Sequence, residues 1–179
     1  MIGAQLFGKL PAHGDFVARG LLPAERDALD DWLAASLARA QQRLGDRFGD
    51  AFDAAPAWRF AERRDDGWLA GALAPSIDSA GRRYPILAVK QARSADYVAA
   101  TAKHCEGAIY DALGGGWDAD TLAAGIEAPP PSQTSAEDAW NGGEGWWSLG
   151  GGGFAPSHLP GRRPSELLAA MLTMREVEA

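Results

Sequence analysis

A serine, a histidine and an aspartate in two short segments of the sequence could together cleave an ester or amide bond. In such a hydrolase Ser76 would be the nucleophile and His13 its base, and Asp15 or Asp78 would orient the imidazole ring. However, Ser76 lies in no Gly-x-Ser-x-Gly elbow, and no backbone donor pair can be nominated for an oxyanion hole. We therefore keep catalysis as an alternative and predict no catalytic residue.

The segment around Ser76 also has a structural interpretation. Asp78 would pair with Arg82 or cap a turn, and Gly81 would supply a positive φ between two strands. We favour this interpretation, because the sequence cannot show that His13 approaches Ser76.

Metal ligands are present, but not at the spacing of a metal site. His13, Asp15, His104 and His158 could contribute, yet no two histidines have the His-x-x-x-His spacing of one helical turn. Cys105 is the only cysteine, which excludes an internal disulfide and a cysteine-rich metal cage and fits a reducing compartment. We expect no metal.

Two glycine runs, residues 114–116 and 150–153, superficially resemble phosphate-binding loops. Neither is followed by the lysine and hydroxyl residue of a P-loop, and neither has the Gly-x-Gly-x-x-Gly spacing of a dinucleotide fold. We interpret the first run as a helix stop and the second as a flexible surface loop, and we expect no cofactor.

Composition narrows the remaining function classes. The chain has 179 residues, is 46% hydrophobic and 23% charged, and carries a formal net charge of −7. The electrostatic field of a negatively charged protein repels phosphate backbones and anionic lipids. The net charge therefore argues against a nucleic-acid partner and against a peripheral membrane protein. No apolar run is long enough to cross a bilayer, and the first residues lack the pattern of a signal peptide. We therefore expect no membrane insertion and a cytoplasmic location.

Hydrophobic periodicity predicts the helices. The clearest covers residues 23–44, with Pro23 at its first position, a buried stripe from Leu29 to Leu44 and Gly45 as its stop. Further helices are expected over residues 46–52, 94–113, 119–126 (with Asp118 as the N-cap) and 164–174.

Strand patterns lie between these helices. Residues 58–62 and 68–73 alternate as a hairpin, and residues 84–91 are apolar on both faces, as in a central strand. Shorter strands are expected at residues 2–7 and 145–149. Helices interleaved with strands imply a sheet that is covered on both faces.

We therefore predict one domain over residues 1–179. Its class is α/β, and its architecture is a three-layer α/β/α sandwich around a mixed central sheet. The proline-rich residues 128–135 form the one segment that resembles a linker. If Trp146 and Trp147 lie on a strand, they point to opposite faces, so one of them could be partly exposed as an interface anchor. The alternative, which we favour, is that the tryptophan covers the sheet beneath the last helix.

Several motifs follow one another along nearly the whole chain. In chain order they are Gly-Lys-Leu-Pro-x-His-Gly-Asp-Phe-Val-x-Arg from residue 8, Trp-Leu from 32, Ala-Pro-x-Trp-Arg-Phe from 55, Gly-x-Leu-x-Pro-Ser-x-Asp-x-x-Gly-Arg from 71, Tyr-Pro-Ile from 84, Trp-Trp-Ser from 146 and Leu-Pro from 159. This ordered set resembles the TagF family of type VI secretion system-associated proteins.

The resemblance implies a three-layer α/β/α fold and a function without catalysis. TagF-like proteins are cytoplasmic accessory factors that repress type VI secretion after translation. They are linked to the forkhead-associated (FHA) domain protein of the system, and the repression does not require threonine phosphorylation. The resemblance thus implies an FHA-domain partner and carries over no catalytic residue. A structural accessory of the secretion apparatus is a further alternative.

The two polar loops are the candidate partner-binding surface. Both combine glycine or proline with charges that look unpaired, so we expect them to lie together as a polar recognition surface. Alternatively, they stabilise the fold by contacting each other, for example through Asp15 or Asp78 and Arg82. The candidate partner-binding residues are Lys9, His13, Asp15, Arg19, Ser76, Asp78 and Arg82.

Overall fold

A seven-stranded sheet organises the protein. The structure, a computed structural model, describes residues 2–130 and 138–175. Within these residues the strands lie in the order β2-β1-β5-β4-β3-β6-β7. Their bounds are β1 Gln5–Gly8, β2 Val17–Arg19, β3 Trp58–Arg64, β4 Gly67–Ala74, β5 Ile86–Ala92, β6 Gly145–Ser148 and β7 Ser157–Pro160.

The prediction of a mixed sheet was wrong, because every neighbouring pair of strands is antiparallel. The sequence pattern suggested parallel crossovers because helices follow strands along the chain. In the structure, however, helical connections join strands that are not neighbours: α1 and α2 lead from β2 to β3, and α3 and α4 lead from β5 to β6. Strand β5 is internal, as its two apolar faces predicted. The short edge strands β2 and β7 were not predicted.

Helices begin and end close to the predicted positions. Pro23 begins α1 and Gly45, with a φ of 53°, follows its last residue, as expected. Asp118 caps α4 by accepting a hydrogen bond from the Thr121 N–H. The proline-rich stretch predicted as a linker lies mostly outside the described residues. The helices are α1 Pro23–Leu44, η1 Gly45–Arg47, α2 Phe48–Ala54, η2 Ala95–Tyr97, α3 Val98–Gly115, α4 Ala119–Glu127 and α5 Leu167–Thr173.

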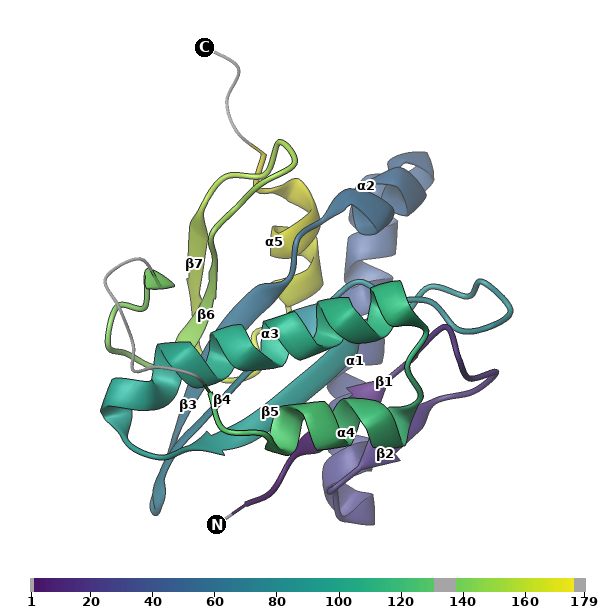
Figure 1. Cartoon of the computed structure of the whole chain (residues 1–179). Helices are drawn as coiled ribbons and strands as arrows, with labels where there is room; N and C mark the ends of the chain where they lie inside the picture. The colour runs from purple at the N-terminus through teal and green to yellow at the C-terminus, as the bar shows by residue number, and fades with distance from the viewer. Residues whose placement is uncertain (1, 131–137, 176–179) are drawn as a thin grey trace.

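The two faces of the sheet carry side chains of different size. Along β4, Leu69 and Leu73 point into the core formed with α1, α2 and α5. Ala70, Ala72 and Ala74 alternate with them and point to the opposite face, where α3 and α4 pack. The small alanines let α3 cross in front of the sheet at close range, while α1 runs behind it (Figure 1).

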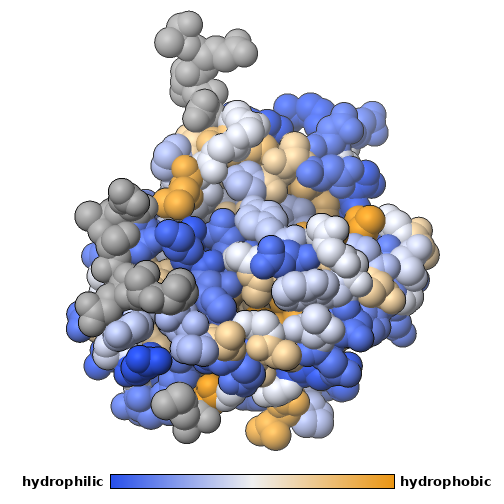
Figure 2. Space-filling model, in the orientation of Figure 1, coloured by the Kyte–Doolittle hydropathy of each residue, from blue (hydrophilic) through white to orange (hydrophobic). Residues whose placement is uncertain are grey.

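The outer surface of the α3 side is largely polar. Figure 2 shows this face as mostly hydrophilic, with only small separate hydrophobic areas. Within the part of the chain that the structure describes, no helix has the length and apolarity to cross a bilayer.

Trp146 and Trp147 occupy opposite faces of β6, as the alternation predicted. Trp146 stacks at a tilt against Phe60, with 4.6 Å between the ring centroids, in the α1 and α5 core. Trp147 lies in the cluster beneath α3, and its indole N–H donates to the Asp138 carbonyl. Both side chains are buried, so neither is the partly exposed anchor that was considered.

Gly71 is a position where the sheet has no room for a side chain. A Cβ atom there would lie 2.1 Å from the Ala88 carbonyl oxygen and 2.7 Å from the Phe60 ring. The ring of Phe60 therefore covers the space that a side chain would need.

We expect Gly71→Ala to lower the free energy of unfolding by about 1–3 kcal/mol, because the added methyl group must displace backbone and a packed ring. Gly107→Ala is the matched control, since its Cβ would meet no atom within 4 Å on the exposed side of α3. That control should instead raise the stability by about 0.5–1 kcal/mol. Urea denaturation of both variants tests the pair, and an equal effect of the two substitutions would contradict the packing account.

Candidate functional site

The two polar loops lie side by side at one end of the sheet. One joins β1 to β2 and the other joins β4 to β5 (Figure 1). The Ser79 N–H donates to the His13 carbonyl at 2.8 Å, and Arg82 Nη2 donates to the Gly14 carbonyl at 2.7 Å. The expectation that these loops come together therefore holds.

A buried carboxylate joins the loops. Asp78 is only 1% exposed, and its Oδ2 accepts hydrogen bonds from Lys9 Nζ at 2.8 Å and from Arg82 Nε at 2.7 Å. Its Oδ1 accepts from the backbone N–H groups of Ala80 and Arg82 at 3.0 and 2.9 Å. The Lys9 hydrogen bond, above all, holds the pKa of Asp78 below its usual range, against the opposing effect of burial. The charges of Lys9, Asp78 and Arg82, which looked unpaired in the sequence, are thus paired.

Ser76 joins the same loops through its hydroxyl group. The buried Ser76 Oγ donates to the Lys9 carbonyl at 2.7 Å, and the Ser76 carbonyl accepts from the Tyr84 N–H at 3.1 Å. The Lys9 N–H in turn donates to the Pro85 carbonyl. The side chain therefore fixes the point where β1 ends and β5 begins.

The His13 side chain forms a hydrogen bond at the start of α4. Its Nε2 accepts a hydrogen bond from the Ala119 N–H at 3.0 Å, at the first turn of α4. This bond places the ring proton on Nδ1 and satisfies one of the free N–H groups that every helix start presents.

The alternative of a Ser76, His13 and Asp15 hydrolase is therefore not supported by the geometry. Ser76 Oγ and His13 Nε2 are both bonded to backbone groups rather than to each other. Asp15 accepts from the neighbouring Phe16 N–H at 2.7 Å and does not orient the imidazole through any contact in the described residues.

Two contacts were proposed for Arg82, one with Asp78 and one with Asp15, and only the first is formed among the described residues. The Asp78–Arg82 pair is present at 2.7 Å. The Asp15–Arg82 pair is absent from the ion pairs of the described residues, and Asp15 is exposed. Arg19 lies further along the chain and pairs with Asp120 on α4 at 2.7 Å.

Burial separates five of the seven candidate residues into two groups, while His13 and Arg19 are half-buried. Lys9, Ser76 and Asp78 are 6%, 5% and 1% exposed and hold the loops together from inside. Arg82 reaches the surface, with 62% of its side chain exposed. Asp15 is exposed beside it in the neighbouring loop.

Sequence reasoning missed two exposed apolar residues in these loops. Phe16 and Ile77 are 45% and 38% exposed. The Phe16 and Tyr84 rings meet edge to face, with 4.8 Å between their centroids, and Lys9 Nζ lies 5.0 Å from the Phe16 ring centroid. A large apolar residue inside a polar, glycine-bearing loop was the signal available in the sequence. We call Asp15, Phe16, Ile77 and Arg82 the loop surface.

Metal binding and thiol reactivity are the other two kinds of chemistry that the candidate residues could support. Among the described residues, no three histidine, cysteine, aspartate or glutamate side chains are grouped so that they could hold a metal ion. Cys105 lies on the buried side of α3, and burial raises the pKa of its thiol to about 12. The thiol is therefore protonated at neutral pH and is not a nucleophile.

Comparison with known proteins identifies the family. Residues 5–128 match the model of the TagF N-terminal domain, described as type VI secretion system-associated. The chain belongs to the TagF family. This match includes both loops of the candidate site, so the TagF resemblance of the sequence motifs is confirmed. No curated protein sequence matches the chain.

The fold of this TagF protein also occurs in a solved structure. The crystal structure of PA0076 from Pseudomonas aeruginosa PAO1 superposes with a TM-score of 0.75 and 21% sequence identity, over 99% of this chain and 97% of that chain. At this identity the likeness shows a shared fold.

The contribution of Asp78 to the stability of this TagF protein depends on pH. Because the pKa of Asp78 is lowered by folding, chiefly through Lys9, its carboxylate stabilises the fold fully above its ordinary pKa of about 4 and progressively less below it. We expect Asp78→Asn to be less stable than the wild type at about pH 7, and the difference in free energy of unfolding to shrink from about pH 5 downward. Urea denaturation across this pH range measures the difference.

Asp15→Asn is the control, because Asp15 is exposed and its side chain bonds only the adjacent backbone. Its stability should follow the wild type at every pH. A difference between wild type and Asp78→Asn that stays constant on acidification would contradict the role given to the buried carboxylate.

Proposed function

We propose that this TagF protein is a non-enzymatic cytoplasmic regulator that represses type VI secretion after translation by binding an FHA-domain component of the system. Its membership of a type VI secretion system-associated family supports the general role. The repression and the FHA-domain partner are our inference.

The observation that carries this proposal is the construction of the loop surface. The polar groups that could have performed catalysis are bonded to backbone or to each other inside the loops. Outside, the same loops present the exposed apolar residues Phe16 and Ile77 together with the charged side chains of Asp15 and Arg82. Apolar contacts surrounded by charge are typical of a protein-binding surface rather than of a reaction centre.

Rigidity favours the same function. Phe16 is held by Tyr84 and Phe7, and the backbone at Ile77 pairs with Arg83 in an isolated bridge. A partner that docks on loops already fixed in place loses less conformational entropy than one that must order them.

Substitutions on the loop surface test partner binding without disturbing the buried cluster. We expect Ile77→Asp and Asp15→Lys each to reduce capture of the system's FHA-domain protein at least tenfold in a pull-down. The melting temperature should stay close to that of the wild type, because both side chains are exposed and neither bonds Asp78.

Leu149→Asp is the matched control, because Leu149 is 43% exposed and lies beside the end of β6, outside both loops. It should retain full capture. Deleting the gene should raise secretion of the tube protein, and complementation with Ile77→Asp should not restore repression, whereas Leu149→Asp should. Equal capture by all the variants would overturn the loop surface as the binding site, and an unchanged level of secretion after deletion would overturn the repressor role.

A further inference from the structure

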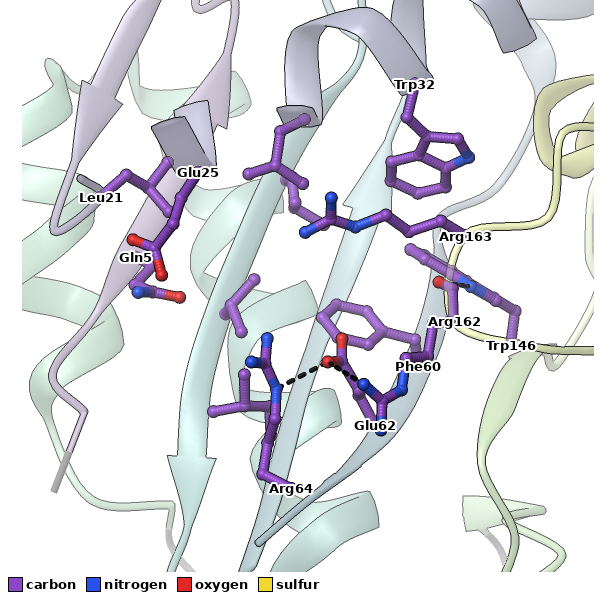
Figure 3. Close-up of a pocket in the computed structure, with 14 residues that line it drawn as sticks. Gln5, Leu21, Glu25, Trp32, Phe60, Glu62, Arg64, Trp146, Arg162 and Arg163 are labelled. Carbon is purple, nitrogen blue, oxygen red and sulfur yellow. Dashed lines mark hydrogen bonds and ion pairs between the residues drawn. The ribbon is translucent and has the colours of Figure 1, made fainter. Parts of the chain in front are cut away.

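A small pocket opens on the α1 side of the sheet, away from the loop surface. Its volume is about 50 Å³. Phe60, Leu69 and Val89 from three neighbouring strands form its apolar floor, and Trp32 and Trp146 form one wall (Figure 3). This volume is about a third of the ~150 Å³ cavity that admits benzene, so the pocket has room for one short aliphatic group.

Arginines dominate the rim of this pocket. Arg64, Arg162 and Arg163 line it together with two carboxylates, those of Glu25 and Glu62. Glu144 also lies beside the rim, with its Oε2 3.0 Å from Arg162 Nε, so three arginines face three carboxylates here. An arginine of this rim that has no carboxylate partner would favour a ligand that combines an anion with an apolar group.

The two rim carboxylates already have partners. The buried Glu62 Oε1 lies 2.6 Å from Arg64 Nε and 3.7 Å from Arg162 Nη1 (Figure 3). Glu25 accepts a hydrogen bond from the Leu22 N–H at 2.8 Å, at the start of α1. Neither carboxylate is bonded to Arg163.

One arginine of the rim, by contrast, has no partner among the described residues. Arg163 makes no hydrogen bond or ion pair within the described residues, and its side chain extends across the pocket (Figure 3). Arg64 Nε, by comparison, forms an ion pair with the Glu62 oxygen 2.6 Å away, and Arg162 pairs with Glu144 and Glu62. Among the rim arginines of the described residues, Arg163 is therefore the one whose charge has no partner.

We propose that this pocket binds the carboxyl terminus of a partner polypeptide whose last residue is small and aliphatic. The side chain of that residue would enter the apolar pocket, and its carboxylate would lie against the guanidinium of Arg163 at the mouth. Arginine is suited to this role because its planar guanidinium can donate two parallel hydrogen bonds to one carboxylate.

A terminal residue fits this geometry better than an internal acidic one. Its carboxylate and its side chain are attached to the same Cα atom, so both can reach a site in which the cation extends across the apolar opening. An internal aspartate or glutamate would have to fill the pocket with one residue and meet Arg163 with another. The small volume also leaves the rest of the partner chain outside, over the arginine rim.

A peptide titration tests this site without knowledge of the secretion-system partner. The probe is the hexapeptide Gly-Ser-Gly-Ser-Gly-Val with a free carboxyl terminus, compared with the same peptide amidated at that terminus and with N-acetylvaline. Binding is followed by NMR through the indole N–H signals of Trp32 and Trp146, with Trp117 on the other face of the sheet as an internal reference. We expect the free acid to bind at least tenfold more tightly than the amide, and to shift only the two pocket tryptophans.

Substitutions assign the carboxylate contact. Arg163→Ala should weaken binding of the free acid to the level of the amide, because it removes the unpaired guanidinium. Arg47→Ala is the matched control, since Arg47 is also exposed but lies in η1 at the other end of α1. Equal binding of acid and amide, an unchanged affinity in Arg163→Ala, or no binding of either peptide would overturn the proposal. N-acetylvaline carries the same side chain and carboxylate on one Cα atom, so it should bind as the hexapeptide does, and its failure to bind would also overturn the proposal.

Discussion

A carboxylate that is buried away from water needs hydrogen-bond donors from the protein. The buried carboxylate of Asp78 has this need, and the residues that meet it form the centre of the candidate site. Its two oxygens accept four hydrogen bonds, from the Lys9 ammonium, the Arg82 guanidinium and two backbone N–H groups. Removing a buried ion from water is costly, so the folded state retains this charge only while the donors stay in place. Because Lys9 follows β1 and Arg82 precedes β5, the requirement also fixes how the ends of these paired strands meet.

The same requirement explains the direction of the exposed side chains. With Lys9 turned inward, the loop that follows β1 closes over it, and the Phe16 ring lies on Tyr84 with the Lys9 ammonium beside its face. His13 continues the arrangement by capping α4. Loops that are bonded this densely present a defined surface, and that is a condition for specific binding with little loss of entropy.

Local sequence patterns predicted most of the helices and strands. What they did not predict depends on contacts between residues that are far apart in the chain. Pro23 and Gly45 bounded α1 correctly because their backbone preferences act within one turn. The antiparallel hairpin of β3 and β4 was predicted correctly, because a two-residue turn joins its strands. The mixed sheet was wrong, because the sequence of a strand does not indicate which distant strand will pair with it. The charges of Lys9 and Asp78 looked unpaired because their partners are 69 residues apart in the chain. For the same reason, the sequence could indicate the loops of the candidate site but not which of their residues face the solvent.

The division between inner and outer residues also bears on the partner binding that we propose for these loops. Ser76 and His13 have the chemistry of a hydrolase, yet their hydrogen bonds to the Lys9 carbonyl and the Ala119 N–H are those of residues that shape backbone. A hydroxyl group that donates to a buried carbonyl cannot leave it without creating an unsatisfied acceptor, which opposes its use as a nucleophile. Side chains such as Ile77 are free of that constraint, because they contribute little to the buried cluster. For the binding that we propose, variation on the outside of these loops can therefore change which partner is bound, whereas the residues inside are needed to hold the loops together.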